Sequence, residues 1–358
     1  MSKPVDFAKI RNVLILRTDH LGDLLLSTPL IRTMRTALPG RHFTLVASPA
    51  NAEALMGWDA VDEVLVFDPA WPLTRKWTFL QELWQTGWDL CLTLSPRTPS
   101  YILGRLSEAP VRAGIIYSRR ILARLFCAVW LTHPVVMEVD ERLAAGKPVP
   151  HEVEQLAEIA EILGLPASEP GPLEFPLKSR AMDWAQEWLT AHGAQVGEES
   201  KKPCIIGIHG AGKWLAQGWT AADFLTLVRS VAAFHTDLKV LLTFGPGDTD
   251  LLTAVKMALA EAPCPSVLWP GPLTVSRWAA LFSQCDAIIS PDTGSLHLAV
   301  ALGRPVVAMY EADTFLHCSA QWAPWQVPSG IVRRGAPGAT VPLLVGELLR
   351  LLPPGRLA

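Results

Sequence analysis

Short apolar runs alternate with longer segments of helical periodicity along most of the first half of this chain. Five runs are predicted as strands: Asn12–Arg17, His42–Ala47, Glu63–Phe67, Trp88–Leu94 and Val111–Ile115. Helical patterns occupy Asp23–Leu38, Leu73–Thr86, Ser118–Leu131 and His151–Gly164. Strands that are apolar on both faces and separated by helices are typical of a parallel sheet covered on both sides. This half therefore predicts a doubly wound α/β domain.

The Pro-rich stretch Leu165–Pro176 interrupts the alternation, and a predicted helix at Ser179–His192 and a polar segment follow it. Five further strands are then predicted: Cys204–Ile208, Lys239–Phe244, Ser266–Leu268, Ala287–Ser290 and Pro305–Met309. Helical patterns occupy Thr220–Phe234, Thr249–Ala260, Thr274–Gln284, Thr293–Leu302 and Val341–Leu352. We place the domain boundary after Pro176, which gives domains 1–176 and 177–358, and we allow the last helix to pack back on the first domain.

Two Rossmann-like domains of this kind are expected to face each other across a cleft. Open α/β sheets bind their ligands at the carboxyl ends of the strands, so the strand-to-helix turns are the places to search for a site.

Composition narrows the class of protein. Half of the 358 residues are hydrophobic, and the net charge is −3, which provides no overall attraction to nucleic acid. The six cysteines are far apart and most lie in apolar runs, which indicates reduced core thiols in a cytoplasmic protein. We find no signal peptide and no apolar run of membrane-spanning length. No metal-ligand spacing is visible, so neither a metal nor a cofactor is expected.

Three strand-to-helix turns carry candidate chemistry. After the first strand, Gly22 permits close approach of a ligand, and Asp23 begins a helix as either a reactive carboxylate or a plain helix-start residue. After the first strand of the second domain come Gly210, Ala211 and Lys213, which suit a pyrophosphate or form an ordinary loop. The spacing there is not that of a P-loop.

The third turn is the strongest candidate for an anion site. Here Asp292, Thr293, Gly294 and Ser295 lead into a helix whose free N–H groups and positive dipole end attract an anion, and His297 lies one turn further. In the alternative interpretation both residues are structural: Asp292 caps the helix, and His297 is a half-buried helix residue. At the end of another strand, Asp248 is placed to bind ribose hydroxyls, with Asp250 as the substitute and a turn or cap as the alternative.

In order along the chain, these segments resemble glycosyltransferase family 9, the ADP-heptose:lipopolysaccharide heptosyltransferases. The opening block VLILRTDHLGDLLLSTPLIRTMRTALPGRHFTLVAS is similar to the first strand, LGD turn and helix of that family. The closing block SPDTGSLHLAVALGRPVVAMY resembles its DTG-x-x-H-L-A signature, and HGAGKWLAQGWTAADF its Gly-Ala loop.

The resemblance implies a GT-B fold, an ADP-sugar donor held mainly by the second domain, and inversion at the anomeric carbon. It implies that Asp23 is the catalytic base and that the Asp292–His297 block binds the donor diphosphate. The family Lys before the Trp of the Gly-Ala loop is replaced here by Gln217, so we expect Lys213 to supply the charge instead.

We expect a lipid-linked glycan as acceptor, bound by the first domain, and peripheral contact with the inner face of the cytoplasmic membrane. The stretch from Cys91 to Met137 holds six Arg against one Glu, and Arg119, Arg120 and Arg124 flank or interrupt an apolar run. A solvated basic face is the alternative there.

Three other functions stay open. The chain could transfer a different nucleotide-activated hexose, or it could bind nucleotide sugars with catalysis lost. A nicotinamide dehydrogenase is disfavoured because no G-x-G-x-x-G follows either first strand.

Overall fold

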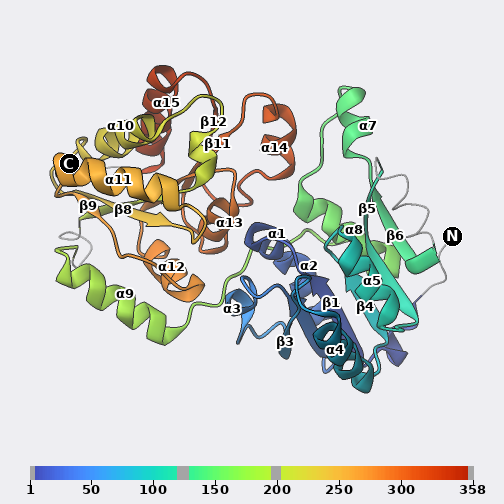
Figure 1. The fold of residues 1–358 in the computed structure, drawn as a ribbon. Helices are drawn as coiled ribbons and strands as arrows, with labels where there is room; N and C mark the ends of the chain where they lie inside the picture. Colours follow the sequence, from blue (N-terminus) through green and yellow to red (C-terminus); the bar gives the residue numbers. More distant parts are fainter. Residues whose placement is uncertain (1–4, 119–128, 195–202, 354–358) are drawn as a thin grey trace. The chain divides into compact units, whose positions relative to one another are not determined.

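The computed structural model describes residues 5–118, 129–194 and 203–353. The chain divides into two compact units, Met1–Pro176 and Leu177–Ala358. In Figure 1 the first unit runs from blue to green and the second from yellow-green to red. Each unit has its own sheet and its own core.

The N-terminal unit contains a six-stranded, fully parallel sheet in the order β3-β2-β1-β4-β5-β6. Its strands are β1 (Asn12–Arg17), β2 (His42–Ala47), β3 (Glu63–Val66), β4 (Leu90–Thr93), β5 (Val111–Tyr117) and β6 (His133–Met137). The first five were predicted. The edge strand β6 was missed because its sequence, HPVVM, is short and contains a proline.

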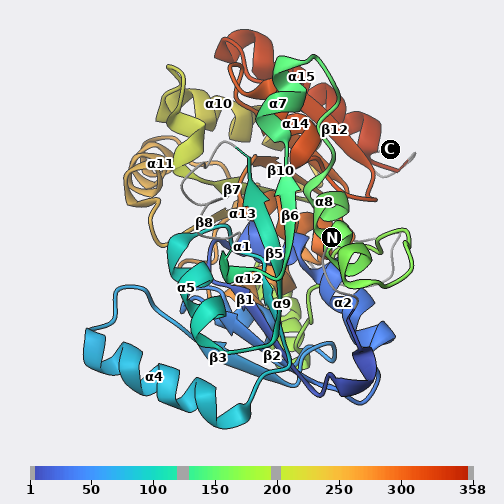
Figure 2. The same ribbon diagram turned by 90° about the vertical axis from the view of Figure 1, so that its right-hand side faces the viewer.

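Helices cover both faces of this sheet: α1 (Leu21–Leu26), α2 (Thr28–Ala37), α3 (Ala52–Leu55), α4 (Leu73–Thr86), α5 (Thr98–Leu106), α7 (Val139–Ala144) and α8 (Glu152–Leu163). Figure 2 shows α4 and α5 on one side and α2 and α8 on the other. Phe79 and Leu83 of α4 and Leu103 of α5 pack against Leu14 and Leu16 of β1. The helix α8 is capped by Gly164 in the left-handed conformation, with a φ of 100°, where the predicted helical pattern ends.

The helix predicted at Asp23–Leu38 is in fact two helices. Ser27 is both the last cap of α1 and the first cap of α2, and its hydroxyl donates to the Asp23 carbonyl over 2.9 Å. Pro29 then lies in the first turn of α2, where its missing N–H costs nothing. The helix predicted at Ser118–Leu131 lies largely outside the described residues.

The C-terminal unit contains a second six-stranded parallel sheet, in the order β12-β11-β10-β7-β8-β9. Its strands are β7 (Cys204–Gly210), β8 (Leu238–Phe244), β9 (Val267–Leu268), β10 (Ala287–Pro291), β11 (Val306–Tyr310) and β12 (Ser329–Arg333). Five were predicted. The edge strand β12 alternates between buried and partly exposed positions, so its apolar signal is too weak to stand out.

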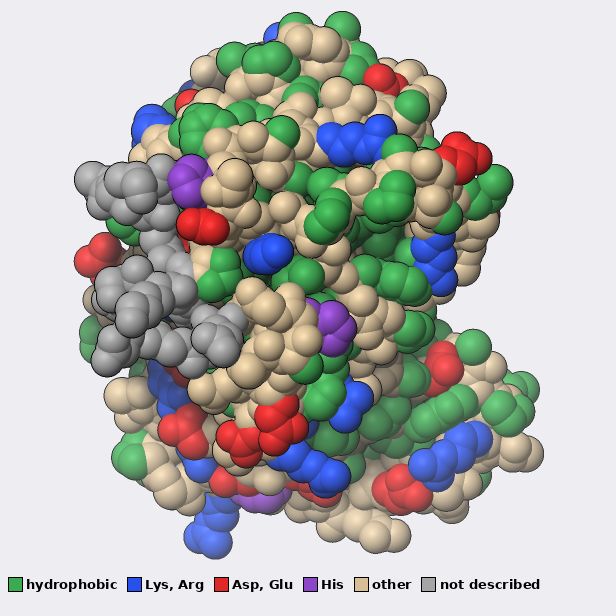
Figure 3. Space-filling view, turned by 90° about the vertical axis from the view of Figure 1, so that its left-hand side faces the viewer, with side chains coloured by type: hydrophobic (Ala, Val, Ile, Leu, Met, Phe, Trp, Pro, Cys, Tyr) green, Lys and Arg blue, Asp and Glu red, His purple; other side chains and the backbone are tan. Residues whose placement is uncertain are grey.

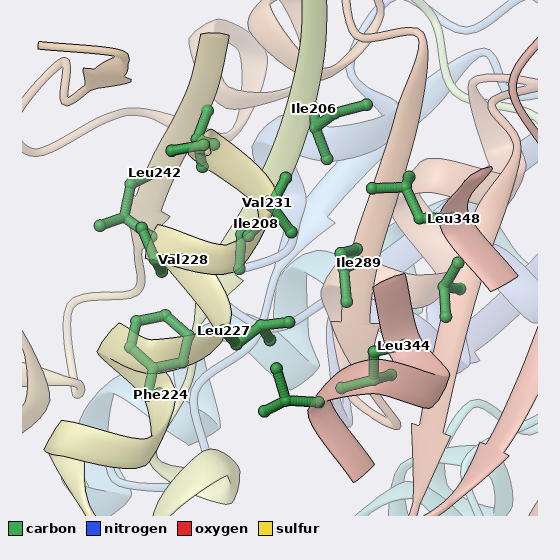
Figure 4. Packing of buried hydrophobic residues seen from close by; sticks show 14 of the residues in the cluster. Ile206, Ile208, Phe224, Leu227, Val228, Val231, Leu242, Ile289, Leu344 and Leu348 are labelled. Atoms are coloured by element: carbon green, nitrogen blue, oxygen red, sulfur yellow. The ribbon is translucent and has the colours of Figure 1, made fainter. Parts of the chain in front are cut away.

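Its helices are α9 (Ser179–Ala191), α10 (Ala221–Ala232), α11 (Thr249–Glu261), α12 (Val275–Phe282), α13 (Gly294–Ala301), α14 (Phe315–Gln321) and α15 (Pro337–Leu351). Figure 4 shows the core between α10, α15 and the sheet, where Phe224 and Leu227 meet Ile208, and Leu344 lies near Ile289. The helix α15 contacts β10, β11 and β12 of its own unit.

Five of the six cysteines fall in the described residues, and all five are free thiols. Four are buried and Cys264 is half-buried, as reduced core residues should be.

On the face drawn in Figure 3, acidic and basic side chains are interspersed among apolar and neutral ones.

Candidate functional site

Three turns of the C-terminal unit gather at the carboxyl ends of neighbouring strands. Strand β7 pairs with β10 on one side and with β8 on the other. The turns that follow these strands therefore lie along one edge of the sheet, and they contain Lys213, Asp248 and Asp292. Strand order thus brings Lys213, Asp248 and Asp292 to one edge of the sheet.

The amino group of Lys213 lies at the start of α13. Its Nζ is 2.8 Å from the Asp292 carboxylate and donates to the Asp292 carbonyl over 2.6 Å. Asp292 immediately precedes Thr293, the N-cap of α13, whose first N–H groups have no partner within the helix. The result is a cation beside the positive end of a helix dipole, which is an arrangement suited to a phosphate.

A chain of hydroxyls stiffens this helix start. The Ser295 oxygen lies 2.6 Å from that of Ser290 and 2.7 Å from that of Thr293. Gly294 has no Cβ at the mouth of the helix, and the buried His297 lies on the first turn. These groups fix the backbone amides of α13 in place.

Asp248 connects two of the turns. Its carboxylate accepts the N–H of Gly212 over 2.6 Å and that of Gly245 over 3.0 Å. Asp248 is the N-cap residue of α11 but makes no side-chain cap hydrogen bond to it, and its two contacts hold the turns at Gly212 and Gly245. A carboxylate has about four acceptor positions, so two remain for hydroxyl donors.

The Gly-Ala loop after β7 is shaped by close packing. A Cβ on Gly210 would lie 2.3 Å from the ring of Phe244, so only glycine fits there. Ala211 is buried, and residues Gly212–Leu215 form a single 3₁₀ turn.

Gln217 faces away from α13. With a φ of 52°, it donates from Nε2 to Asp313 over 2.8 Å and accepts the Ala312 N–H over 3.3 Å. Its amide therefore holds the turn after β11.

Two tryptophans near these turns differ in burial. Trp214 is fully buried, its indole N–H donating to the His209 carbonyl, so it belongs to the core. Trp269 is partly exposed, and the Lys256 ammonium lies 4.1 Å from its ring centre. The His209 ring stacks on Trp278 at 4.6 Å, and burial lowers the pKa of His209 to about 4, so that this imidazole is neutral at pH 7.

In the N-terminal unit, Asp23 lies at the third position of α1 with its side chain 29% exposed. Its carboxylate accepts the His20 backbone N–H over 3.3 Å and lies 3.3 Å from His20 Nδ1. Burial raises the pKa of Asp23, but His20 and the Arg17 guanidinium outweigh it and lower the pKa to about 2. The carboxylate is ionised at neutral pH, and it also completes a capping box.

Buried Arg17 organises this turn. It donates to the Asp23 carbonyl over 2.9 Å and to Glu152 of α8 over 2.9 Å, and it lies 3.4 Å from the Asp19 carboxylate. It also donates to the Leu94 carbonyl. Gly22, between these groups, is buried in the first turn of α1. The Asp23 carboxylate lies 4.0 Å from the guanidinium, so one cation lies near three carboxylates at the end of β1.

Sequence reasoning missed Arg17, Asp19, His20 and Glu152. The sequence did contain one signal: the charged residue Arg17 ends an otherwise apolar strand. A buried arginine is stable only beside a buried group of opposite charge. Its partner Glu152 is 135 positions away and could not be identified from spacing.

One part of the predicted basic face is wrong. Arg112 is half-buried and donates to the Ala109 and Trp130 carbonyls, each over 2.5 Å, so it is a structural residue. Arg119, Arg120 and Arg124 lie outside the described residues. No helix in the described ranges is both long and apolar enough to cross a membrane. Within the same ranges, no three His, Cys, Asp or Glu side chains are grouped as metal ligands.

Comparison with known proteins decides the family. The sequence profile of glycosyltransferase family 9 (heptosyltransferase) matches residues 76–337, which is well over half of the chain. The chain belongs to glycosyltransferase family 9. It is therefore a glycosyltransferase, and the resemblance that the LGD and DTGSLH blocks carried is confirmed.

Known structures share the fold of this family 9 glycosyltransferase. A family 9 glycosyl transferase from Veillonella parvula is 19% identical, with a TM-score of 0.79 over 98% of this chain and 99% of that one. Heptosyltransferase WaaC from E. coli with ADP is 18% identical, with a TM-score of 0.70 over 95% and 99%. The predicted GT-B class, with two parallel Rossmann-like sheets, is confirmed.

Among curated proteins, the chain is 24% identical to the lipopolysaccharide core heptosyltransferase OpsX of Haemophilus influenzae, over 164 residues. This match covers 45% of the glycosyltransferase and 42% of OpsX. The profile match includes the three donor-side turns but begins after Asp23, so the role of that carboxylate rests on its own geometry and on the resemblance.

Proposed function

We propose that this glycosyltransferase moves a sugar, heptose as the first choice, from an ADP-sugar to a lipopolysaccharide-core or related lipid-linked glycan with inversion. The observation that carries the donor assignment is the position of Lys213 Nζ at the start of α13, beside Asp292. Heptosyltransferase WaaC of E. coli, which has a similar fold, has been solved with ADP and also with ADP-2-deoxy-2-fluoro heptose.

On the donor side, the diphosphate binds at the N-terminus of α13. Its negative charge grows as the sugar leaves, and one helix end offers only about half a positive charge. Lys213 supplies the remaining charge, and the backbone amides from Gly294 and Ser295 supply directed donors. Asp248 binds the ribose hydroxyls with the acceptor positions that its two backbone contacts leave open.

On the acceptor side, Asp23 takes the proton of the attacking hydroxyl as it forms the new bond to the anomeric carbon. Its low pKa keeps it ionised and ready to accept, although a carboxylate of pKa about 2 is a weak base. An acceptor hydroxyl that displaces His20 from the carboxylate raises that pKa and makes Asp23 a better base at the moment of transfer.

The donor proposal is tested by melting curves of the protein with a panel of ADP-, UDP- and GDP-sugars. A ligand at one hundred times its Kd adds about 2.7 kcal/mol of stability, so the true donor stands out. Lys213→Ala should weaken ADP binding and lower turnover strongly. If UDP- or GDP-hexoses alone stabilise the protein, the alternative of another nucleotide hexose is correct.

A turnover assay distinguishes an active transferase from a protein that only binds nucleotide sugars. A binding protein of this kind would bind ADP-sugar but release no ADP in the presence of acceptor glycan. Retention of an ionised Asp23 favours an active enzyme.

We also propose contact of the N-terminal unit with the anionic inner membrane surface. Vesicles containing anionic lipid should retain the wild-type protein more than neutral vesicles do, and Arg119→Glu with Arg124→Glu should abolish the difference. Lys178→Glu with Arg180→Glu makes the same charge change in the C-terminal unit and serves as the control. Equal binding to both vesicle types rules the contact out.

A further inference from the structure

Arg334, just beyond β12, reaches under the loop that carries Lys213. Its buried guanidinium donates to the carbonyls of Lys213 over 2.6 Å, Trp214 over 3.0 Å and Ala216 over 3.2 Å. One side chain therefore satisfies three acceptors of a loop whose only regular structure is one 3₁₀ turn.

The guanidinium is itself held on its other sides. The Glu311 carboxylate lies 2.9 Å from Arg334 Nε, and the ring of Trp219 lies 5.2 Å from the guanidinium carbon. The backbone N–H of Arg334 donates to the Tyr310 carbonyl over 2.8 Å. Burial lowers the pKa of Arg334 while Glu311 opposes the shift, and the group stays charged at neutral pH.

Only an arginine matches this geometry. Its planar fork presents fixed donors that reach three carbonyls at once, while its charge forms an ion pair with Glu311. A lysine at this position would bring one mobile point charge with three donors, so it could not hold the same three carbonyls in a fixed relation.

The loop is also held by the fully buried Trp214 side chain and by the Gly212 N–H that Asp248 accepts, but only Arg334 donates side-chain hydrogen bonds to the carbonyls of Lys213, Trp214 and Ala216 among the described residues. Gln217 and Gly218 both adopt positive φ, 52° and 84°, and the chain reverses there before α10. Without Arg334 the Lys213 and Ala216 carbonyls keep the backbone N–H donors of Ala216 and Trp219, but the Trp214 carbonyl loses its side-chain donor. A buried carbonyl without a donor is strongly disfavoured, so the loop is expected to shift until water reaches it.

We propose that Arg334, fixed by Glu311, is a positioning residue that sets the backbone of residues 213–216 so that Lys213 Nζ remains at the start of α13 for the donor diphosphate. The inference rests on the donor site of the proposed function. It adds that the affinity of this enzyme for a nucleoside diphosphate depends on a salt bridge that does not touch the nucleotide.

The test is a double-mutant cycle on ADP affinity, measured by calorimetry on the full chain. Lys213→Ala removes a charge-assisted contact and should raise the ADP Kd by about tenfold or more. Arg334→Ala should raise it by a similar factor. The double variant should bind ADP about as weakly as Lys213→Ala alone, because Arg334 acts through Lys213. A residue that merely stabilises the unit would leave the ADP Kd unchanged, and one that affects ADP binding independently of Lys213 would multiply the two fold-changes.

Two conservative variants keep the test valid if Arg334→Ala does not fold. Arg334→Lys keeps the positive charge but removes the planar guanidinium. Glu311→Gln keeps a hydrogen-bond acceptor but removes the negative charge. Both variants should weaken ADP binding. Arg350→Ala is the matched control, because Arg350 also pairs with a glutamate and donates to a strand carbonyl of the same unit, at a different place. It should leave the ADP Kd unchanged.

Hydrogen exchange in the free protein separates the possible failures. Arg334→Lys should speed amide exchange in residues 212–219 and leave α15 unchanged. Unchanged loop exchange, or multiplying effects in the cycle, overturns the positioning role while the donor site stands. Failure of wild-type protein to bind ADP overturns the proposed donor, and the inference with it, even where the exchange result shows that Arg334 holds the loop.

Discussion

Replacing Asp23 by asparagine tests whether this carboxylate is a base or only a helix cap. In the wild-type protein the Asp23 carboxylate accepts the His20 backbone N–H over 3.3 Å. The side-chain oxygen of asparagine can accept the same N–H, so α1 should begin at the same residue. Buried Arg17 keeps two carboxylates, Glu152 at 2.9 Å and Asp19 at 3.4 Å. The fold should therefore survive the substitution.

The stability cost follows from the pKa of Asp23. Folding lowers it from 3.8 to about 2, which corresponds to about 2 kcal/mol of stability at neutral pH. A carboxylate whose pKa is lowered by folding stabilises the protein fully at a pH above its pKa in the unfolded chain. That stabilisation is lost as the pH falls through its pKa in the folded protein. The difference between wild type and Asp23→Asn in urea unfolding should thus be largest above pH 5 and should shrink from pH 4 towards pH 2.

The catalytic cost is much larger. Loss of general-base assistance lowers rates by about 10² to 10⁴. The rate of transfer, followed by ADP release with acceptor present, should fall by that factor while calorimetry shows an unchanged ADP Kd.

The chain offers a matched control in a second capping box. Glu154 of α8 accepts the His151 backbone N–H over 2.9 Å at the same helical position that Asp23 occupies in α1. Glu154→Gln should cost about 0.5–1 kcal/mol and leave transfer unchanged. If Asp23→Asn lost ADP affinity, failed to fold, or transferred sugar at the wild-type rate, Asp23 would be a structural cap and not the base.

Three further changes have defined outcomes. His20→Ala removes a contact that lowers the pKa of Asp23, so the acid limb of the kcat/KM profile should move from about 2 towards 3.8, and an unmoved limb would show that the contact does not form in solution. Gly210→Ala drives a methyl group to within 2.3 Å of a phenyl ring and should cost about 1–3 kcal/mol in urea unfolding, whereas Gly247→Ala, with nothing within 4 Å, should cost little. Gln217→Lys should change turnover little, and a clear gain would show that the site lacks a cation and would favour the binding-protein alternative.

The sequence by itself determined most of the architecture. Ten of the twelve strands in the described residues were predicted, because buried parallel strands are continuous apolar runs bounded by turns. The two that were missed, β6 and β12, are edge strands with broken apolar patterns. The turns proposed to bind the donor were selected for a related reason, since small residues and a cation at strand ends stand out against apolar strands.

Only the tertiary structure decided which groups are neighbours. It paired Lys213 with Asp292 across 79 positions and Arg17 with Glu152 across 135, and it turned Gln217 towards Asp313. It also directed Arg112, counted as part of a basic face, to backbone carbonyls. Periodicity reports which side of an element faces the core, because that depends on residues a few positions apart. The partner of a buried charge depends on strand order and on loop paths, which no local pattern contains.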